Sequence, residues 1–377
     1  MDLTSGVQIG RIRGIDIRVH WSWLLIFGLL SWSLSQGLFG EMFVGWSPVQ
    51  QWAAGITTTL LFFLSVLLHE LSHAFVAQRL GMEVPSITLF IFGGVSSIKT
   101  EMQTAGQEFR VAIAGPLMSW ALALIFAAVW YLTRSVEGAA IFGYLGFINA
   151  LLGAFNLLPG FPLDGGRIFR SMVWARSKDL LQATRVASRV GVLIAYAMIA
   201  VGLISVLAFG LFGGFWYVLI GLFLKSAAEG ALASMLVETA LKDVETSTVM
   251  RAAPKPVDAD LPLQWFVDER LLETAERASL VARDTVVVGL ITAGDVMKVP
   301  RDRWSATPVA SAMVPVERVF TVTPRTGVIE ALRLMREHDV HQLPVLDDGR
   351  VLGMLTRGDL MRQIELRTVF RERGDGD

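Results

Sequence analysis

The sequence contains no cysteine, and only 18% of its 377 residues are charged. The absence of cysteine excludes disulfide bonds and thiolate zinc ligands, and it leaves the redox compartment open. The low charge content, together with 53% hydrophobic residues, departs from an ordinary soluble protein and indicates a membrane protein. A formal net charge of −1 leaves no excess of lysine or arginine for phosphates, so we expect no nucleic-acid partner.

Long runs without charged residues are typical of membrane-spanning helices, which need about 20 apolar residues. Spans are expected within the segments Trp21–Gly40, Met42–Gln78, Val111–Thr133, Gly138–Leu163 and Val190–Leu224. The last segment would measure roughly 52 Å as one helix, against a hydrocarbon core of roughly 30 Å. Because Gly210, Gly213 and Gly214 interrupt it, we interpret it as a hairpin of two spans, which makes six; one long span is the alternative.

Arginine and lysine are distributed unevenly around these spans. They gather in the N-terminal tail, between spans two and three, and between spans four and five, whereas the segments after spans one and five have none. By the positive-inside rule, both termini and the two basic loops face the cytoplasm, which predicts a multi-pass protein of the cell membrane. His69, near the end of span two, and Asp164, near the end of span four, then approach the same side.

A His-Glu-x-x-His pattern, formed by His69, Glu70 and His73, lies inside one of the most apolar segments. On a helix the two histidines are one turn apart, so both imidazoles point to one face, which suits a tetrahedral zinc ion. Glu70 is then available as a base for the attacking water. Such polar groups are costly at membrane depth, and they therefore call for a partner or a function.

Zinc needs a further protein ligand, and the candidates are few because the sequence has only five histidines. Asp164, in a Leu-Asp-Gly-Gly turn, is the obvious carboxylate, and three protein ligands leave a fourth position for water, as in catalytic zinc sites. The alternative for Asp164 is a turn or helix cap. Asn156, about two helical turns earlier, could hydrogen-bond a developing oxyanion or hold a neighbouring helix.

The segment Leu80–Lys99 is apolar but does not have the pattern of a helix, because it is rich in β-formers and broken by Gly93-Gly94. At membrane depth, non-helical backbone must be buried in protein or line a cavity. We therefore expect a re-entrant β-hairpin here, with an ordinary surface loop as the alternative.

After about Val237 the composition becomes that of a soluble protein with an internal repeat. Gly289–Asp295 recurs as Gly353–Asp359, and each copy has a strand–helix–strand–strand–helix pattern, as expected for one module made of two repeats. The expected organisation is a membrane domain at 1–237, a linker at 238–248, repeats at 249–308 and 309–368, and a flexible tail at 369–377.

These motifs resemble the site-2 protease family of intramembrane zinc metalloproteases. His-Glu-Leu-Ser-His at 69–73 and Asn156…Pro159…Leu163-Asp164-Gly165 match two family motifs, and the C-terminal repeats resemble a pair of cystathionine-β-synthase (CBS) domains. The combination resembles a subgroup that includes the protease processing a sporulation sigma factor. The resemblance implies one zinc ion on His69, His73 and Asp164, Glu70 as base, and Asn156 as a helper near the scissile carbonyl. It also implies that Phe92, Gly93 and Gly94 pair with the substrate as an added strand, which would hold an unwound segment extended.

The CBS resemblance implies an adenosine nucleotide, ATP or AMP, in the cleft between the repeats. Thr292, Asp295, Thr356 and Asp359 fit the positions that contact phosphate and ribose. The first repeat departs from the pattern, with Ser279-Leu280-Val281 where the second has Leu343-Pro344-Val345. A dimerising scaffold without ligand is the alternative, and we expect homo-oligomers through these domains in either case.

The sequence therefore predicts a mainly α fold: a six-helix transmembrane metalloprotease core with a re-entrant β-hairpin, and a cytosolic α/β CBS pair. The predicted function is zinc-dependent cleavage of transmembrane or membrane-proximal segments of membrane-protein substrates in the lipid bilayer, regulated by nucleotide or by dimerisation. A CBS-regulated transporter or channel is one alternative, and the clustering of intramembrane charge near one face disfavours it. The intact zinc-binding pattern disfavours the other alternative, a catalytically inactive adaptor.

Overall fold

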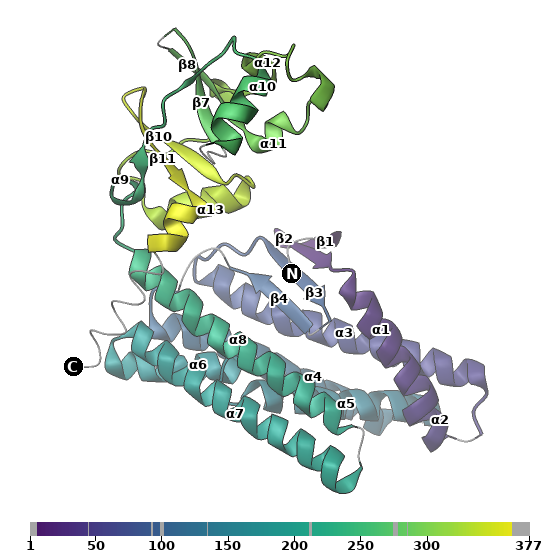
Figure 1. Cartoon of the computed structure of the whole chain (residues 1–377). Coiled ribbons are helices and arrows are strands. Elements are labelled where there is room, and N and C mark those ends of the chain that lie inside the picture. The colour runs from purple at the N-terminus through teal and green to yellow at the C-terminus, as the bar shows by residue number, and fades with distance from the viewer. Residues whose placement is uncertain are drawn as a thin grey trace. The chain divides into compact units, whose positions relative to one another are not determined.

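The computed structural model describes residues 6–43, 45–91, 93–98, 102–133, 135–210, 213–273, 278–284 and 286–363. The chain forms two compact units, Met1–Ala233 and Ser234–Asp377 (Figure 1). Phe92, the expected tail at 369–377 and the end of the expected second repeat lie outside the described residues.

Within the described residues, six helical segments are long and apolar enough to cross a membrane, which confirms the predicted number of spans. They are Ser22–Met42, made of α1 (Ser22–Trp32), η1 (Ser33–Leu38) and α2 (Phe39–Met42), then α3 (Pro48–Arg79), α4 (Ala105–Leu132), α5 (Val136–Asn156), α7 (Leu180–Phe209) and α8 (Gly214–Leu241). The uncharged run at 190–224 is thus a hairpin of two spans, with the break at Gly210 in a left-handed conformation that glycine adopts readily.

Capping residues explain where α3 and α4 begin. Ser47 and Gln50 form a capping box at the start of α3, with Pro48 in the first turn, and Thr104 and Gln107 form another at the start of α4. In each box a side-chain oxygen accepts a hydrogen bond from an otherwise unpaired backbone N–H.

The fourth span ends earlier than the sequence pattern indicates. α5 stops at Asn156, and a non-helical turn leads to a separate helix, α6 (Asp164–Ser177). Pro159 and Pro162 lie in this turn, and proline interrupts a helix because it lacks a backbone N–H and clashes with the preceding turn. Asp164 is therefore the first residue of α6 rather than part of a membrane span.

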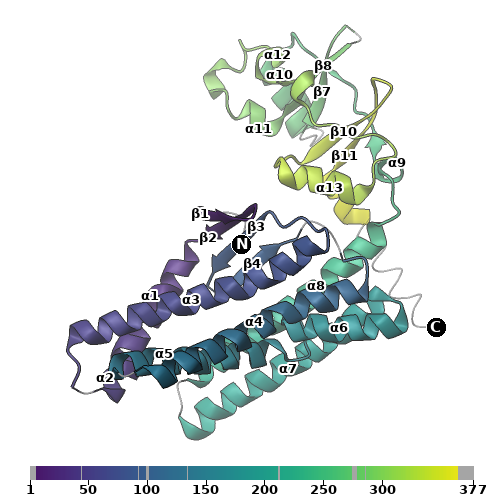
Figure 2. The same ribbon diagram turned by 180° about the vertical axis from the view of Figure 1, so that it is seen from behind.

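The first unit also contains a four-stranded sheet in the order β1-β2-β3-β4, made of β1 (Val7–Ile12), β2 (Ile15–Val19), β3 (Ser86–Phe90) and β4 (Gly93–Ser97). β3 and β4 form the predicted hairpin, and β2 runs parallel to β3. Ile15, Ile17 and Ile87 are buried in one core with Leu71 and Ala74 of α3. The sheet thus packs beside the C-terminal half of α3, as both views show (Figures 1 and 2).

The second unit contains two small sheets, one of order β10-β11-β5 and one of order β6-β7-β8-β9. The strands are β5 (Arg251–Ala252), β6 (Val257–Asp258), β7 (Ala278–Arg283), β8 (Val286–Thr292), β9 (Val314–Pro315), β10 (Gln342–Asp347) and β11 (Arg350–Thr356). After the end of α8, the helices with both ends among the described residues are α9 (Thr246–Val249), α10 (Leu263–Phe266), η2 (Val267–Leu272), α11 (Ala293–Val296), η3 (Arg301–Arg303), α12 (Val309–Ala312), η4 (Val316–Arg318) and α13 (Val328–Glu337). The hairpins β7–β8 and β10–β11 correspond to each other, as the sequence repeat predicts.

The two repeats exchange their first segments. β5, at the start of the first repeat, pairs with β11 of the second, whereas β9, near the start of the second repeat, pairs with β8 of the first. Accordingly, Val249 is buried in the core of the second repeat and Val309 in that of the first. Leu241 and Val244, in the segment expected to be a linker, are also buried in the core of the second repeat, so part of 238–248 is packed structure.

Candidate metal centre

Two histidines on α3 present their Nε2 atoms to each other. His69 and His73 are 5% and 4% exposed, and the distance between their Nε2 atoms is 3.3 Å. They are four residues apart, so the helix places both rings on one face, as predicted. An apolar segment of α3 therefore carries two buried nitrogen donors at a common point.

Asp164 completes the cluster from α6. Its Oδ2 atom lies 3.1 Å from Nε2 of His69 and 3.2 Å from Nε2 of His73. Tetrahedral zinc with ligand distances of about 2.0–2.1 Å requires about 3.3–3.4 Å between ligand atoms, close to the separations seen here. The structure thus brings together the three residues that the sequence proposes as ligands.

The outer nitrogen of each imidazole contacts α4. Nδ1 of His69 lies 2.8 Å from Oγ of Ser119, and Nδ1 of His73 lies 2.7 Å from the carbonyl oxygen of Val111. A carbonyl oxygen only accepts hydrogen bonds, so Nδ1 of His73 carries the proton and its Nε2 presents a lone pair in the neutral ring. Such outer contacts fix the orientation and tautomer of metal-binding histidines.

The cluster fits a bound cation. Three atoms with lone pairs converge within hydrogen-bond distance, and such a group is stable only when protons or a metal ion lie between them. The oxygen of the Asp164 carboxyl group completes this set as a hard ligand, of the kind that binds divalent metals together with imidazole nitrogens.

Glu70 follows His69 on α3 and is contacted by the β-hairpin. The hydroxyl of Ser96 in β4 donates to Oε2 of Glu70 at 2.8 Å, and Gly94 of the same strand lies against the Glu70 side chain. Gly93 begins β4 with a positive φ. Asn156 is the last residue of α5, and its amide donates to the Leu152 carbonyl of its own helix at 3.1 Å.

A buried ion pair joins α4 to α6. Glu108 is fully buried and accepts two hydrogen bonds from the guanidinium of Arg170, one of them at 2.7 Å from Nε. Arg170 also donates to the hydroxyl of Thr184 on α7 at 3.3 Å. Sequence reasoning missed this pair as well as Ser96 and Ser119, because nothing in their local sequence distinguishes them from other polar residues near membrane helices.

In the second unit, the four residues expected to bind nucleotide form two local pairs. Thr292 and Asp295 form a capping box at the start of α11, and Thr356 donates to Asp359 in the same way. Each aspartate also accepts a hydrogen bond from a basic side chain: Lys298 at 2.8 Å from Asp295, and Arg251 at 2.5 Å from Asp359.

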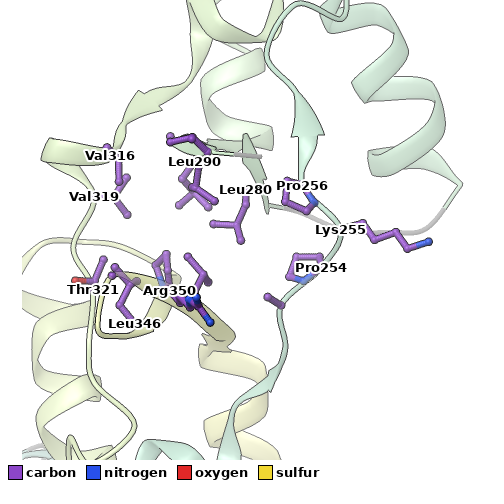
Figure 3. Close-up of a pocket in the computed structure, with 17 residues that line it drawn as sticks. Pro254, Lys255, Pro256, Leu280, Leu290, Val316, Val319, Thr321, Leu346 and Arg350 are labelled. Carbon is purple, nitrogen blue, oxygen red and sulfur yellow. The ribbon is translucent and has the colours of Figure 1, made fainter. Parts of the chain in front are cut away.

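A cavity of about 600 Å³ lies between the two repeats. Figure 3 shows Leu280 and Leu290 of the first repeat on one side and Leu346 and Arg350 of the second on the other, while Lys255 points away. None of the four predicted nucleotide-binding residues is among the described residues that line this cavity.

Comparisons with known proteins cover both units. Peptidase family M50 matches residues 57–137 and 134–198, and the CBS domain matches residues 309–366. Rip3 of Mycobacterium tuberculosis, named as a zinc metalloprotease, is 34% identical over 370 residues, which cover 97% of this chain and 94% of Rip3. The similarly named sll0528 of Synechocystis is 33% identical over 367 residues, 96% of each chain. The solved site-2 protease from Methanocaldococcus jannaschii has 30% identity and a TM-score of 0.45, and the match covers 60% of this chain and 95% of that one.

Similarity over almost the full length of these relatives defines the protein as a multi-pass, membrane-embedded zinc metalloprotease. It belongs to the site-2 protease family, with CBS sequence at its C-terminal end, so the predicted family and enzyme class are confirmed. This membership excludes the transporter alternative as the primary function.

Proposed function

We propose that this protein hydrolyses peptide bonds in transmembrane or membrane-proximal segments of other membrane proteins, with His69, His73 and Asp164 as the zinc ligands. The observation that carries this proposal is the convergence of two Nε2 atoms and one carboxylate oxygen within 3.3 Å of one another. Glu70, next to the first ligand, is the proposed general base, and the buried position of the cluster in an apolar bundle favours substrates that also lie in the membrane.

A bound zinc ion supplies Lewis-acid chemistry, which acidifies a water molecule and polarises a carbonyl group. The Glu70 carboxylate takes the proton from the attacking water and delivers it to the leaving amine. Asn156 helps near the scissile carbonyl once its amide turns from the Leu152 carbonyl, because an amide N–H stabilises a developing oxyanion.

The substrate pairs with β4 as an added strand in this proposal. β4 is the last strand in the sheet order, so its outer edge is not paired with another strand among the described residues. Backbone hydrogen bonds along Gly93 and Gly94 hold an unwound substrate segment extended, which exposes a peptide bond that a helix would shield. Phe92, which was predicted to share this role, lies outside the described residues.

Cleavage by the parent and by Glu70→Gln tests the proposal. The substrates are single-span membrane proteins reconstituted with the purified full chain, and zinc per chain is measured in the same preparations. We expect the parent to cleave and Glu70→Gln to keep only a small residual activity with its zinc retained, while Glu41→Gln, an exposed position of α2, cleaves normally. Equal cleavage by Glu70→Gln and the parent, or a parent without stoichiometric zinc, would overturn the proposal.

We further propose that both termini and the second unit face the cytoplasm. An even number of spans places the two termini on the same side, and the basic loops favour the cytoplasmic side of the cell membrane. A reporter fused after Asp377 that is active only in the cytoplasm tests this orientation, and activity of a periplasmic reporter there would refute it.

The second unit is the proposed site of regulation by an adenine nucleotide. Its cavity has the volume of a small-molecule site and is walled by both repeats, so a ligand would change how they pack. Binding regulates cleavage only when the nucleotide prefers one arrangement of the enzyme. Because Asp295 and Asp359 are both engaged by basic side chains, binding at these residues requires those contacts to rearrange.

Isothermal titration of the full chain with ATP and AMP tests this regulatory role, alongside native mass measurements of its oligomeric state. We expect binding that Arg350→Ala, in the lining of the cavity, weakens and that Asp302→Asn, on the exposed η3, leaves unchanged. If millimolar nucleotide gives no heat of binding and does not change the cleavage rate, the regulatory proposal is refuted. The role of this unit is then that of a dimerising scaffold.

A further inference from the structure

One strand of the sheet makes two separate contacts with the side chain of Glu70. The hydroxyl of Ser96 donates to Oε2 at 2.8 Å. Two residues earlier, a Cβ on Gly94 would lie 2.5 Å from Cγ of Glu70, so the backbone of β4 passes directly over this side chain. Residues two apart in a strand share a face, so Gly94 and Ser96 place one face of β4 on Glu70.

The Ser96 hydroxyl orients the carboxylate. Among the described residues, it supplies the hydrogen bond that holds Glu70, which has no partner on its own helix. A general base must lie within hydrogen-bond reach of the proton that it takes, and a misplacement of about 1 Å can reduce rates about 100-fold. A flexible glutamate in a partly buried site therefore needs a fixed donor to stay in position.

The strand that carries Ser96 is also the edge strand of the sheet. β3 pairs with its inner edge through Ile87, opposite Ser96, and no other described strand pairs with its outer edge. A peptide added to that outer edge would fix the strand by backbone hydrogen bonds. Fixing the strand would also fix the Ser96 hydroxyl, because the side chain is attached to the same backbone.

We propose that Ser96 is a positioning residue that aligns the Glu70 carboxylate for proton transfer, and that β4 thereby couples seating of the substrate to alignment of the base. This inference rests on the proposed function, in which Glu70 is the base and β4 receives the substrate. Ser96 makes no contact with His69, His73 or Asp164 among its described hydrogen bonds, so it acts on the base and not on the metal.

Three variants of the reconstituted full chain test the proposal with a single-span substrate. Ser96→Ala removes the donor, Ser96→Thr retains a hydroxyl, and Ser86→Ala is the matched control, because it removes a serine from β3 of the same sheet whose contact is with Ser97. We expect kcat of Ser96→Ala to fall about 10- to 100-fold, the range for loss of an orienting contact, with KM within about twofold and zinc content unchanged. Ser96→Thr restores most of kcat, and Ser86→Ala resembles the parent.

A coupling measurement separates alignment of the base from a general effect on folding. In a Glu70→Gln background, Ser96→Ala should cause no further loss of residual activity, because the group that it orients is already absent. The inference fails if Ser96→Ala retains the kcat of the parent, if Ser96→Thr is as impaired as Ser96→Ala, or if the loss persists in the Glu70→Gln background. Activity of Glu70→Gln equal to that of the parent would instead refute the proposed function itself.

Discussion

Replacing Gly115 with alanine, which adds a single methyl group, should greatly weaken zinc binding. Gly115 lies on α4 directly against the two imidazoles, and a Cβ there would be 2.2 Å from Nε2 of His73 and 2.4 Å from Nε2 of His69. Ordinary contacts begin near 3.4 Å, so the rings or the helix must move by about 1 Å. Metal sites tolerate deviations of only about 0.2 Å in ligand distance.

The expected effect of Gly115→Ala is a loss of zinc affinity greater than about 100-fold, since losing an outer contact alone costs 10- to 100-fold. The matched control is Gly106→Ala in the first turn of the same helix, where a Cβ meets nothing within 4 Å. This control should bind zinc normally and gain up to about 1 kcal/mol of helix stability.

Zinc per chain, measured by mass spectrometry after dialysis against a competing chelator, provides the assay. Thermal melting of the metal-free proteins checks that both variants fold. If Gly115→Ala keeps one zinc per chain at the affinity of the parent, the cluster of His69, His73 and Asp164 is not the zinc site.

Three further predictions concern the surroundings of the cluster. Ser119→Ala should lower zinc affinity about 10-fold, because it removes the contact with Nδ1 of His69. Competition with a chelator measures this affinity, and an unchanged value would contradict the role of that contact. Arg170→Gln leaves Glu108 buried without its charge partner, which should lower the free energy of unfolding by about 3 kcal/mol. The double variant Glu108→Leu/Arg170→Met should be less destabilised. Equal melting temperatures for the parent and both variants would argue against a role of the ion pair in stability. Treatment with 1,10-phenanthroline should abolish cleavage and zinc should restore it; resistance to the chelator would argue against a metal-dependent reaction.

The sequence predicted those features that depend on local pattern. A long uncharged run indicates a membrane span regardless of which helices pack against it. The spacing of His69 and His73 likewise places both side chains on one face of their helix. Asp164 could be identified because few carboxylates were available near the apolar segments. The hairpin at 86–97 followed from β-formers around two glycines.

Features that depend on distant pairing left no such pattern. β2 and β3 are parallel neighbours, although two spans separate them in the chain, and nothing in either strand specifies the other. The repeat likewise revealed matching segments but not their exchange. Val249-Met250 matches Ala312-Met313 in sequence, yet Val249 is buried in the core of the second repeat and Ala312 packs against the core of the first. In the sequence, Ser96 and Ser119 resemble any small polar residue of a hairpin or membrane helix, and only the fold places them beside Glu70 and His69.

One face of α4 explains why the cluster forms where it does, although this helix contributes no ligand. Val111, Gly115 and Ser119 follow at intervals of four residues, and they contact in turn His73, both histidines, and His69. One turn before them, Glu108 holds Arg170 of the helix that begins with the aspartate. All three proposed ligands are therefore positioned against a single rigid surface, because residues four apart on a helix share a face. Substitutions on this face should change zinc affinity, whereas those on the lipid-exposed face of α4, such as Leu124→Ala, should not.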